Sequence, residues 1–277
     1  MHPIIPYFEP IKFVIPIPGT DGVPIHGFGI LVATGFLAGS WLAQRKARRD
    51  GFDPEVINRL LGWLVVGVFV GGHLGHALLY DPKEYFAHPL EFLKVWEGLS
   101  SFGGFVACAI IVWAFLKRNR LPFWPYADSI AYGLTLGWAL GRCGCTVAKD
   151  HPGTITQFWL GFPGMCPGGD PLVACHNLGF YEALFAFGLL GLFLWLNRKP
   201  RFPGFYVGWL CTLYAPARFG MDFLRHPDID NRYAGLTPAQ WGCLVMLPLG
   251  LWFLFSRSAL APLRGEPEAP PAPESSG

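Results

Sequence analysis

Long apolar runs, separated by short polar and basic stretches, dominate the chain. Seven runs have the length of a membrane helix: 24–43, 59–80, 98–116, 126–145, 179–196, 203–223 and 238–256. About 20 apolar residues in an α-helix cross the roughly 30 Å hydrocarbon core of a bilayer. The pattern therefore predicts an all-α, polytopic membrane protein with about seven transmembrane helices.

Basic residues gather after every second run. The four clusters are Arg45, Lys46, Arg48 and Arg49; Lys117, Arg118 and Arg120; Arg198, Lys199 and Arg201; and Arg257 with Arg264. Short loops rich in Lys and Arg stay on the cytoplasmic side. All four clusters share one side only when the number of spans is odd, which predicts an N-terminus outside and a C-terminus in the cytoplasm.

Composition narrows the class and the domain organisation. The chain is 52% hydrophobic and 14% charged with a net charge of +2, which excludes a disordered protein and a nucleic-acid partner. Residues 1–23 carry no signal-peptide pattern and are predicted to lie along the outer surface. Residues 24–256 form one transmembrane domain with an outer loop at 146–178. The Pro- and Glu-rich residues 257–277 predict a disordered cytoplasmic tail.

Two arginines interrupt the apolar runs at membrane depth. Arg142 ends the fourth run and Arg218 lies inside the sixth, with Asp150, Glu182 and Asp222 nearby in sequence. A guanidinium costs several kcal/mol in this environment unless it faces a polar cavity or an anion. The pattern predicts an intramembrane site for a phosphate-like group.

Each of these residues also has a plain structural interpretation. Arg142 could snorkel to the headgroups from a helix end. Arg218 and Asp222, four residues apart, could form a purely structural ion pair. Glu182 could be a charge at the N-terminus of the fifth helix.

Cysteines in the outer loop raise two further possibilities. Cys166 and Cys175 lie in an extracytoplasmic segment where a disulfide can form, so a bridge and two free thiols both remain open. Cys143, Cys145 and His151 could be considered as metal ligands. Because C-x-C is not a strong zinc spacing, we predict no metal and no cofactor.

An ordered series of sequence blocks resembles one known family. In chain order they are "PIHGFGILVATGFLAG", "GGHLGHALLYDPKEYFAHPLEFLKVWEG", "SSFGG", "GRCGCTVAKDHPG", "FYEALF", "YAPARFGMDFLRHPD" and "LTPAQWGCLVMLPLGL". Together they are similar to prolipoprotein diacylglyceryl transferases from about residue 20 to residue 256.

The resemblance implies an activity, a location and two substrates. It implies transfer of a diacylglyceryl group from phosphatidylglycerol to the lipobox cysteine in the signal peptide of a preprolipoprotein. The enzyme would be a multi-pass protein of the bacterial cytoplasmic (inner) membrane, in contact with the lipid bilayer. Arg142, Gly153, Arg218, Glu182 and His26 match residues of the family motifs.

The chain departs from the family at several of these motifs. Cys145 replaces the signature asparagine, Asp150 and Asp222 replace glutamates, and Phe28 replaces a tyrosine. Phe102 replaces the histidine of the family's H-G-G motif, which has been considered the base.

Three explanations of the missing histidine stay open. His151, or His73 or His76 in the second run, could replace it; two arginines could lower the thiol pKa without a base; or the chain could be a paralogue. Such a paralogue would use another phospholipid or acceptor, or would bind anionic lipid without catalysis.

The candidate site residues follow from these arguments. The predicted catalytic residues are Arg142, Asp150, His151 and Arg218, and the predicted substrate-binding residues are His26, Gly103, Gly104, Gly153, Glu182 and Asp222.

Overall fold

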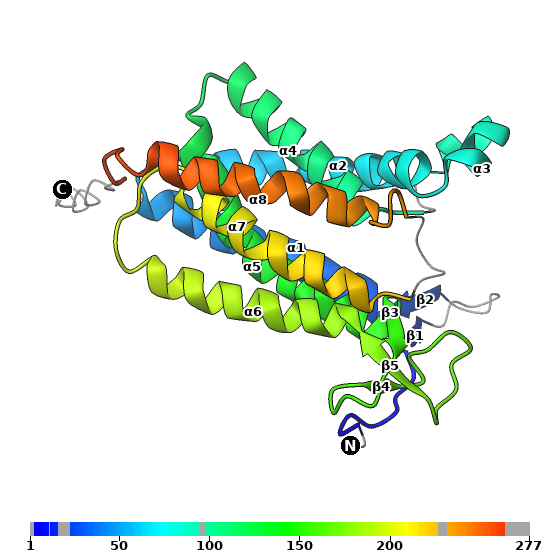
Figure 1. Cartoon of the computed structure of the whole chain (residues 1–277). Helices are drawn as coiled ribbons and strands as arrows, with labels where there is room; N and C mark the ends of the chain where they lie inside the picture. Colours follow the sequence, from blue (N-terminus) through cyan, green and yellow to red (C-terminus); the bar gives the residue numbers. More distant parts are fainter. Residues whose placement is uncertain (1–2, 11, 16–22, 95–97, 227–231, 264–277) are drawn as a thin grey trace, which may run out of the picture.

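Long helices packed side by side form the body of the protein (Figure 1). The computed structural model describes residues 3–10, 12–15, 23–94, 98–226 and 232–263. Within them the long helices are α1 (Gly27–Arg49), α2 (Glu55–Leu79), α4 (Ser101–Arg118), α5 (Phe123–Ala148), α6 (Leu178–Leu196), α7 (Phe205–Met221) and α8 (Pro238–Arg257). Each overlaps one of the predicted apolar runs.

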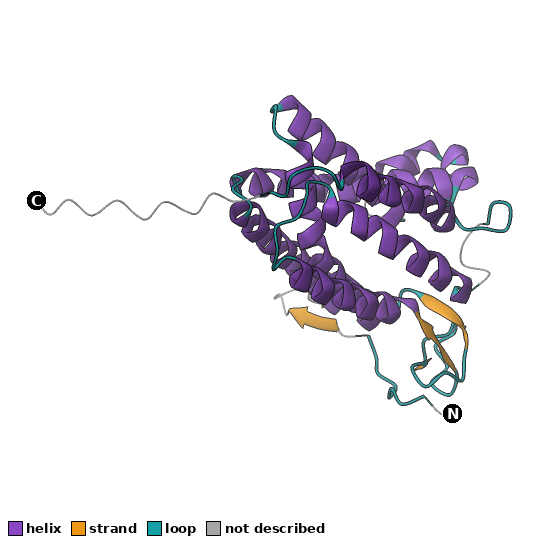
Figure 2. Cartoon of the chain, turned by 60° about the vertical axis from the view of Figure 1, so that its left-hand side comes forward, coloured by secondary structure: helices purple, strands orange, loops and turns teal. Residues whose placement is uncertain are grey.

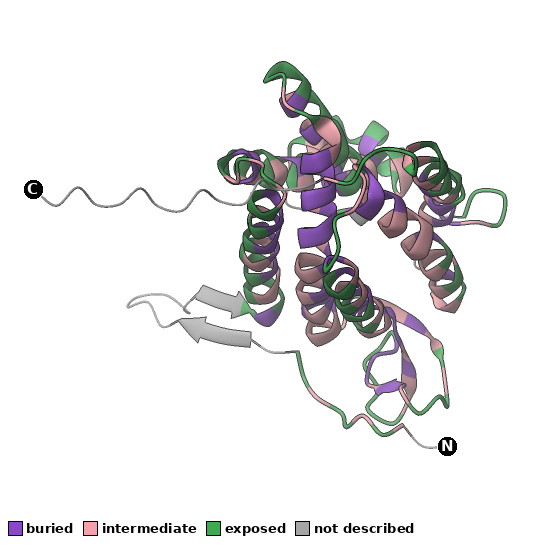
Figure 3. Cartoon of the chain, turned by 90° about the vertical axis from the view of Figure 1, so that its left-hand side faces the viewer, coloured by how far each residue is buried: buried purple, intermediate pink, exposed green. Residues whose placement is uncertain are grey.

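Four of the described helices are long and apolar enough to cross a membrane: α1, α2, α6 and α8. Large apolar side chains remain exposed on their surfaces, among them Trp41, Leu194 and Phe255. Figure 3 shows many buried residues on the central helices and exposed ones on the outer helices. An apolar exterior of this kind is suited to lipid, and the prediction of a helical membrane protein is confirmed in this coarser form.

Short elements that the sequence did not predict complete the fold. Between α2 and α4 lie α3 (Pro82–Ala87) and the 3₁₀ helix η1 (Pro89–Leu93), and η2 (Asp222–Leu224) follows α7. The strands are β1 (Lys12–Ile15), β2 (Val23–His26), β3 (Pro152–Ile155), β4 (Phe162–Pro163) and β5 (Ala174–Asn177). The all-α prediction therefore needs a correction, because the 146–178 loop folds into a small antiparallel sheet with the order β3-β5-β4.

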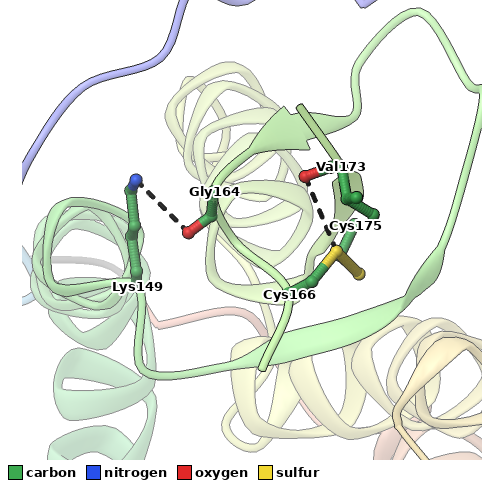
Figure 4. The surroundings of a disulfide bond; sticks show 5 residues. All are labelled: Lys149, Gly164, Cys166, Val173 and Cys175. Carbon is green, nitrogen blue, oxygen red and sulfur yellow. Dashed lines mark hydrogen bonds between the residues drawn. A yellow bond between two sulfur atoms is a disulfide. The ribbon is translucent and has the colours of Figure 1, made fainter. Parts of the chain in front are cut away.

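A disulfide cross-links the loop that forms this sheet. Cys166 and Cys175 are bonded to each other, and the Lys149 ammonium lies 3.5 Å from the Gly164 carbonyl oxygen (Figure 4). Of the two possibilities that the sequence left open, the bridge is the one the structure contains. A cross-link across this loop restricts the unfolded chain and stabilises the folded sheet.

The N-terminal segment packs beside the same sheet at one end of the helices (Figure 2). The Ile4 amide donates to the Trp159 carbonyl at 2.9 Å, and the Phe8 and Phe162 rings pack edge to face at 6.1 Å. Strands β1 and β2 pair as an antiparallel hairpin directly before α1. Parts of the predicted surface segment 1–23 and most of the predicted tail (1–2, 11, 16–22 and 264–277) lie outside the described residues.

A buried carboxylate joins α5 to α7 at the opposite end of the bundle. Asp128 accepts backbone N–H groups from Gly204 at 2.7 Å, Phe205 at 3.1 Å and Val207 at 3.0 Å. The first amides of a helix have no partner inside the helix, and an anion among them is favourable. Asp128 therefore caps α7 and fixes its position against α5.

Candidate active site

The two predicted arginines meet at one glutamate. Arg142 near the end of α5 and Arg218 near the end of α7 both contact Glu182, which lies on the first turns of α6. Arg142 contacts one carboxylate oxygen through Nε, and the Nε atom of Arg218 lies 3.1 Å from the other. Glu182 is only 2% exposed, so it is a buried counterion shared by two guanidinium groups.

A second carboxylate holds Arg218 from the other side. Asp222 is completely buried and accepts from Arg218 Nη1 at 2.6 Å. The Thr237 hydroxyl donates to the other Asp222 oxygen, and Thr237 is also the N-cap of α8. The ion pair predicted at this spacing exists, and it also joins α7 to the start of α8.

Two further residues of this cluster escaped the sequence analysis. The Tyr214 hydroxyl donates to Glu182 Oε1 at 3.2 Å, and Arg225 Nη1 lies 3.7 Å from Asp222 Oδ1. Tyr214 precedes Arg218 by four positions and therefore shares its helix face, which is the signal that could have identified it.

His151 and Asp150 extend the cluster toward the outer loop. Asp150 Oδ1 lies 2.5 Å from His151 Nδ1, and His151 Nε2 lies 3.3 Å from Arg142 Nη1. A guanidinium can only donate, so Nε2 must carry the lone pair and Nδ1 the proton. Burial lowers the pKa of His151, the Arg142 charge lowers it further, and the hydrogen bond to Asp150 opposes both.

The ligand-type atoms of Cys145, Asp150 and His151 lie within 4.8 Å of one another. Arg142 Nη1, however, lies 3.8 Å from Cys145 Sγ as well as 3.3 Å from His151 Nε2. A metal ion in this position would face a permanent positive charge, and two of its three ligands already contact the guanidinium. These residues therefore do not fit a metal ion.

A large cavity extends from this cluster into the bundle. Its volume is about 1500 Å³, and Arg142, Asp150, His151, Arg218 and Arg225 line its polar end. The wall formed by α8 extends from Pro238 to Phe253, which is about 22 Å of helix. Away from the arginines the lining includes Leu134, Leu189, Leu210, Val245, Met246 and Leu249. The cavity thus joins a cationic end to a long apolar chamber.

The three glycines predicted to bind substrate lie against other segments of the protein. A Cβ atom on Gly103 would lie 2.3 Å from the Gly71 carbonyl oxygen, so α2 and α4 can approach closely only with glycine here. A Cβ on Gly104 would have its nearest contact at 3.5 Å. A Cβ on Gly153 would lie 2.6 Å from the Leu224 carbonyl oxygen, which explains the close approach of β3 to the end of η2.

The remaining histidines occupy different positions. His26 is exposed at the start of α1 and is not among the described residues that line the cavity. His73 is buried with its ring 5.4 Å from that of Tyr85, whereas His76 lines the cavity. Phe102, which replaces the family histidine, also lines the cavity.

The apolar helices, the arginine cluster and the chamber below it define a helical membrane protein with a site suited to an anionic lipid. Comparison with known sequences gives the family: the family described as prolipoprotein diacylglyceryl transferase matches residues 17–256, and the chain belongs to it.

Individual relatives agree with this assignment. The chain is 36% identical over 235 residues to the phosphatidylglycerol–prolipoprotein diacylglyceryl transferase of Janthinobacterium sp., covering 81% of this chain and 87% of the relative. Relatives with the same name in Cereibacter sphaeroides and Chromohalobacter salexigens are 34% identical over 262 residues and 33% identical over 231 residues. They cover 83% and 82% of this chain and 89% and 85% of the relatives.

Proposed function

We propose that the protein transfers the diacylglyceryl group of phosphatidylglycerol to the lipobox cysteine of preprolipoproteins. The observation that carries this proposal is the position of Arg142 and Arg218, fixed by Glu182 at the polar end of an apolar cavity. The names of the relatives specify phosphatidylglycerol and a prolipoprotein, which supports this lipid and this class of acceptor.

The cavity suits the two parts of this lipid. Arg142 and Arg218 both line it, whereas Glu182 and Asp222 are not among the described lining residues and lie behind the guanidinium groups. A phosphodiester can therefore approach the cations without meeting their counterions, and Arg suits phosphate oxygens because its donors form a planar fork. The acyl chains would occupy the apolar chamber along α8.

The chemical step is a displacement at the glycerol carbon that carries the phosphate. The thiolate sulfur forms a bond to this carbon, the carbon–oxygen bond to phosphate breaks, and its electron pair leaves with glycerol phosphate. Negative charge grows on the leaving phosphate, so fixed guanidinium groups stabilise the transition state more than the bound lipid.

His151 is our candidate for the proton acceptor. His151 lines the polar end of the cavity, where its Nε2 lone pair accepts from Arg142 and its Nδ1 proton is held by Asp150. When Arg142 turns its donors to the phosphate, Nε2 would become free to accept the thiol proton. In the proposed step Nε2 takes the thiol proton and later passes it to glycerol phosphate, which balances the reaction. Asp150 would stabilise the transient imidazolium in the manner of a general base and its orienting carboxylate.

The proposal includes the full topology. Seven membrane spans, with the N-terminus outside and the tail 257–277 in the cytoplasm, would place the disulfide-bonded sheet and the arginine cluster at the outer side of the bacterial inner membrane. The signal peptide of a preprolipoprotein would then present its cysteine from the bilayer. The basic clusters after every second helix support this orientation.

The test is a transfer assay with purified protein in nanodiscs. Phosphatidylglycerol and a lipobox peptide are supplied, and release of glycerol phosphate is followed together with the mass of the peptide. A peptide with serine in place of cysteine is the control. Thiol-dependent release supports the transferase; binding of the lipid without release would replace it with a lipid-binding function.

A further inference from the structure

Trp138 lies directly beneath the arginine cluster. It precedes Arg142 by one turn of α5, and the guanidinium carbon lies 4.3 Å from the centre of its ring. Phe105 of α4 packs on the indole with ring centroids 4.7 Å apart, and Tyr214 of α7 meets it edge to face at 5.8 Å. The indole thus contacts two other helices, α4 and α7, at the level where the polar end of the cavity becomes apolar.

The same spacing of tryptophan and cation occurs elsewhere in the chain. Arg45 lies 5.6 Å from the Trp41 ring, and Lys117 lies 4.6 Å from the Trp113 ring. Both of these tryptophans are more than half exposed and lie near the C-terminal ends of their helices, as residues that anchor a helix at the membrane interface do. Trp138 is partly buried and lines the cavity, so interfacial anchoring does not explain it.

The indole also carries an unused donor. Trp138 Nε1 is buried, and no acceptor for it exists among the described residues. A buried N–H without an acceptor costs free energy, and native proteins rarely keep one. The indole ring itself lines the cavity, so a rotation of the ring as lipid enters would bring this donor to an acceptor on the lipid.

We propose that Trp138 sets the depth of the lipid: its ring supports Arg142 at the phosphate, and its N–H donates to an ester carbonyl of the diacylglyceryl group. This rests on the proposed function. Trp138 and Arg142 are one helical turn apart, about 6 Å along the axis, and in a glycerophospholipid the ester carbonyls follow the phosphate after the short glycerol backbone. A lipid held at both points has its reacting glycerol carbon between the levels of Trp138 and Arg142.

The test compares ester-linked phosphatidylglycerol with its ether-linked analogue, which has no ester carbonyl. In the wild type the ether lipid should raise KM by about tenfold, the usual worth of one hydrogen bond at the upper end of its range. Trp138→Phe should raise KM for the ester lipid to the same value and abolish the preference, with kcat nearly unchanged because a ring still supports Arg142.

Two further variants separate the ring from the donor. Trp138→Leu should lower kcat as well, because Arg142 loses its support. Trp113→Leu removes an equivalent tryptophan outside the cavity and should leave both constants unchanged. An unaltered ester preference in Trp138→Phe, or no preference in the wild type, would overturn the proposal.

The experiment keeps this proposal separate from the proposed function. Thiol-dependent release by the wild type tests the transferase alone. Should release be absent, the ester and ether lipids can still be compared by the thermal stabilisation that each gives to the wild type and to Trp138→Phe. Equal stabilisation of the wild type by both lipids would overturn the role of Trp138 without reference to catalysis.

Discussion

Two networks of buried charge lie at opposite ends of the same helix pair, α5 and α7. At one end Asp128 accepts three backbone amides at the start of α7. At the other end, about 21 Å away along α5, Arg142 and Arg218 pair with the carboxylate of Glu182 beside a cavity.

The difference lies in what the charges have as partners. The acceptors of Asp128 are occupied by backbone groups that no ligand can replace, so this charge holds helices together. The guanidinium groups are held from behind by side chains, and they also line an open space. Burial alone therefore does not distinguish a structural charge from a functional one. The arginines differ from Asp128 because one side of each guanidinium group faces the cavity.

Arg142→Ala should give the largest effect, a loss of turnover of about a thousandfold, and Arg218→Ala should behave similarly. Each removes a fixed cation from the developing phosphate charge. Mass spectrometry of the lipidated peptide measures the loss. The control combines Arg142→Ala with Glu182→Gln, which removes the carboxylate charge that Arg142 balanced and leaves an amide oxygen for Arg218. Recovery of thermal stability without recovery of turnover is expected; recovery of both would reduce Arg142 to an ion-pair partner.

His151→Ala should lower kcat by about a hundredfold, the usual contribution of a general base. Since the pKa of His151 is lowered, its neutral form persists below the ordinary histidine value of about 6.5, and activity should fall only as the pH drops through that lowered value. The variant should lose this acidic limb of the pH–rate profile. His88→Ala, at an exposed position, is the matched control. A greater loss in His73→Ala would move the role to α2.

Loss of the disulfide should act mainly on stability. Cys166→Ser with Cys175→Ser should lower the free energy of unfolding by about 2–4 kcal/mol and loosen the sheet that continues from His151. Thermal denaturation in detergent measures this change. A reducing agent should shift the wild type toward the variant and leave the variant unaffected, and a wild type that is insensitive to reductant would contradict the stabilising role.

Asp128→Asn should give the smallest of these effects, and it tests whether the Asp128 end of α5 and α7 serves stability alone. One amide oxygen can still accept, so the loss should be about 1–2 kcal/mol of stability. Turnover per folded molecule should equal that of the wild type at a temperature where both are folded. A fall in turnover at unchanged stability would show that the Asp128 network also controls the site.

The lengths of the apolar runs predicted the helices, and the two charges inside these runs indicated Arg142 and Arg218 as candidate site residues. Both signals are local properties of the sequence. Glu182 is different: its position at the start of α6 also fitted a simple helix-end charge. Its bridging role depends on how α6 is rotated against α5 and α7. No pattern within a single helix specifies that rotation.

The small sheet and the structural surroundings of Gly153 could not be predicted from the sequence for a related reason. Strands of two to four residues are too short to show an alternation of apolar and polar residues. The pairing of β3 with β5 is also irregular, so no regular register could be inferred from the sequence. Gly153 matched a family motif, yet its surroundings are the backbone of η2 and β5 rather than an open cavity wall. Contacts between segments far apart in sequence decided both features.

The shared counterion has a consequence for selectivity among anions. Glu182 already neutralises part of the charge on Arg142 and Arg218. The electrostatic attraction that remains for a soluble anion such as inorganic phosphate therefore offsets little of the free energy that the anion loses on leaving water. A lipid gains in addition from every methylene that enters the chamber along α8. Discrimination between free phosphate and the phosphate of a lipid would therefore come from the apolar walls of the chamber, because the arginines can contact both in the same way.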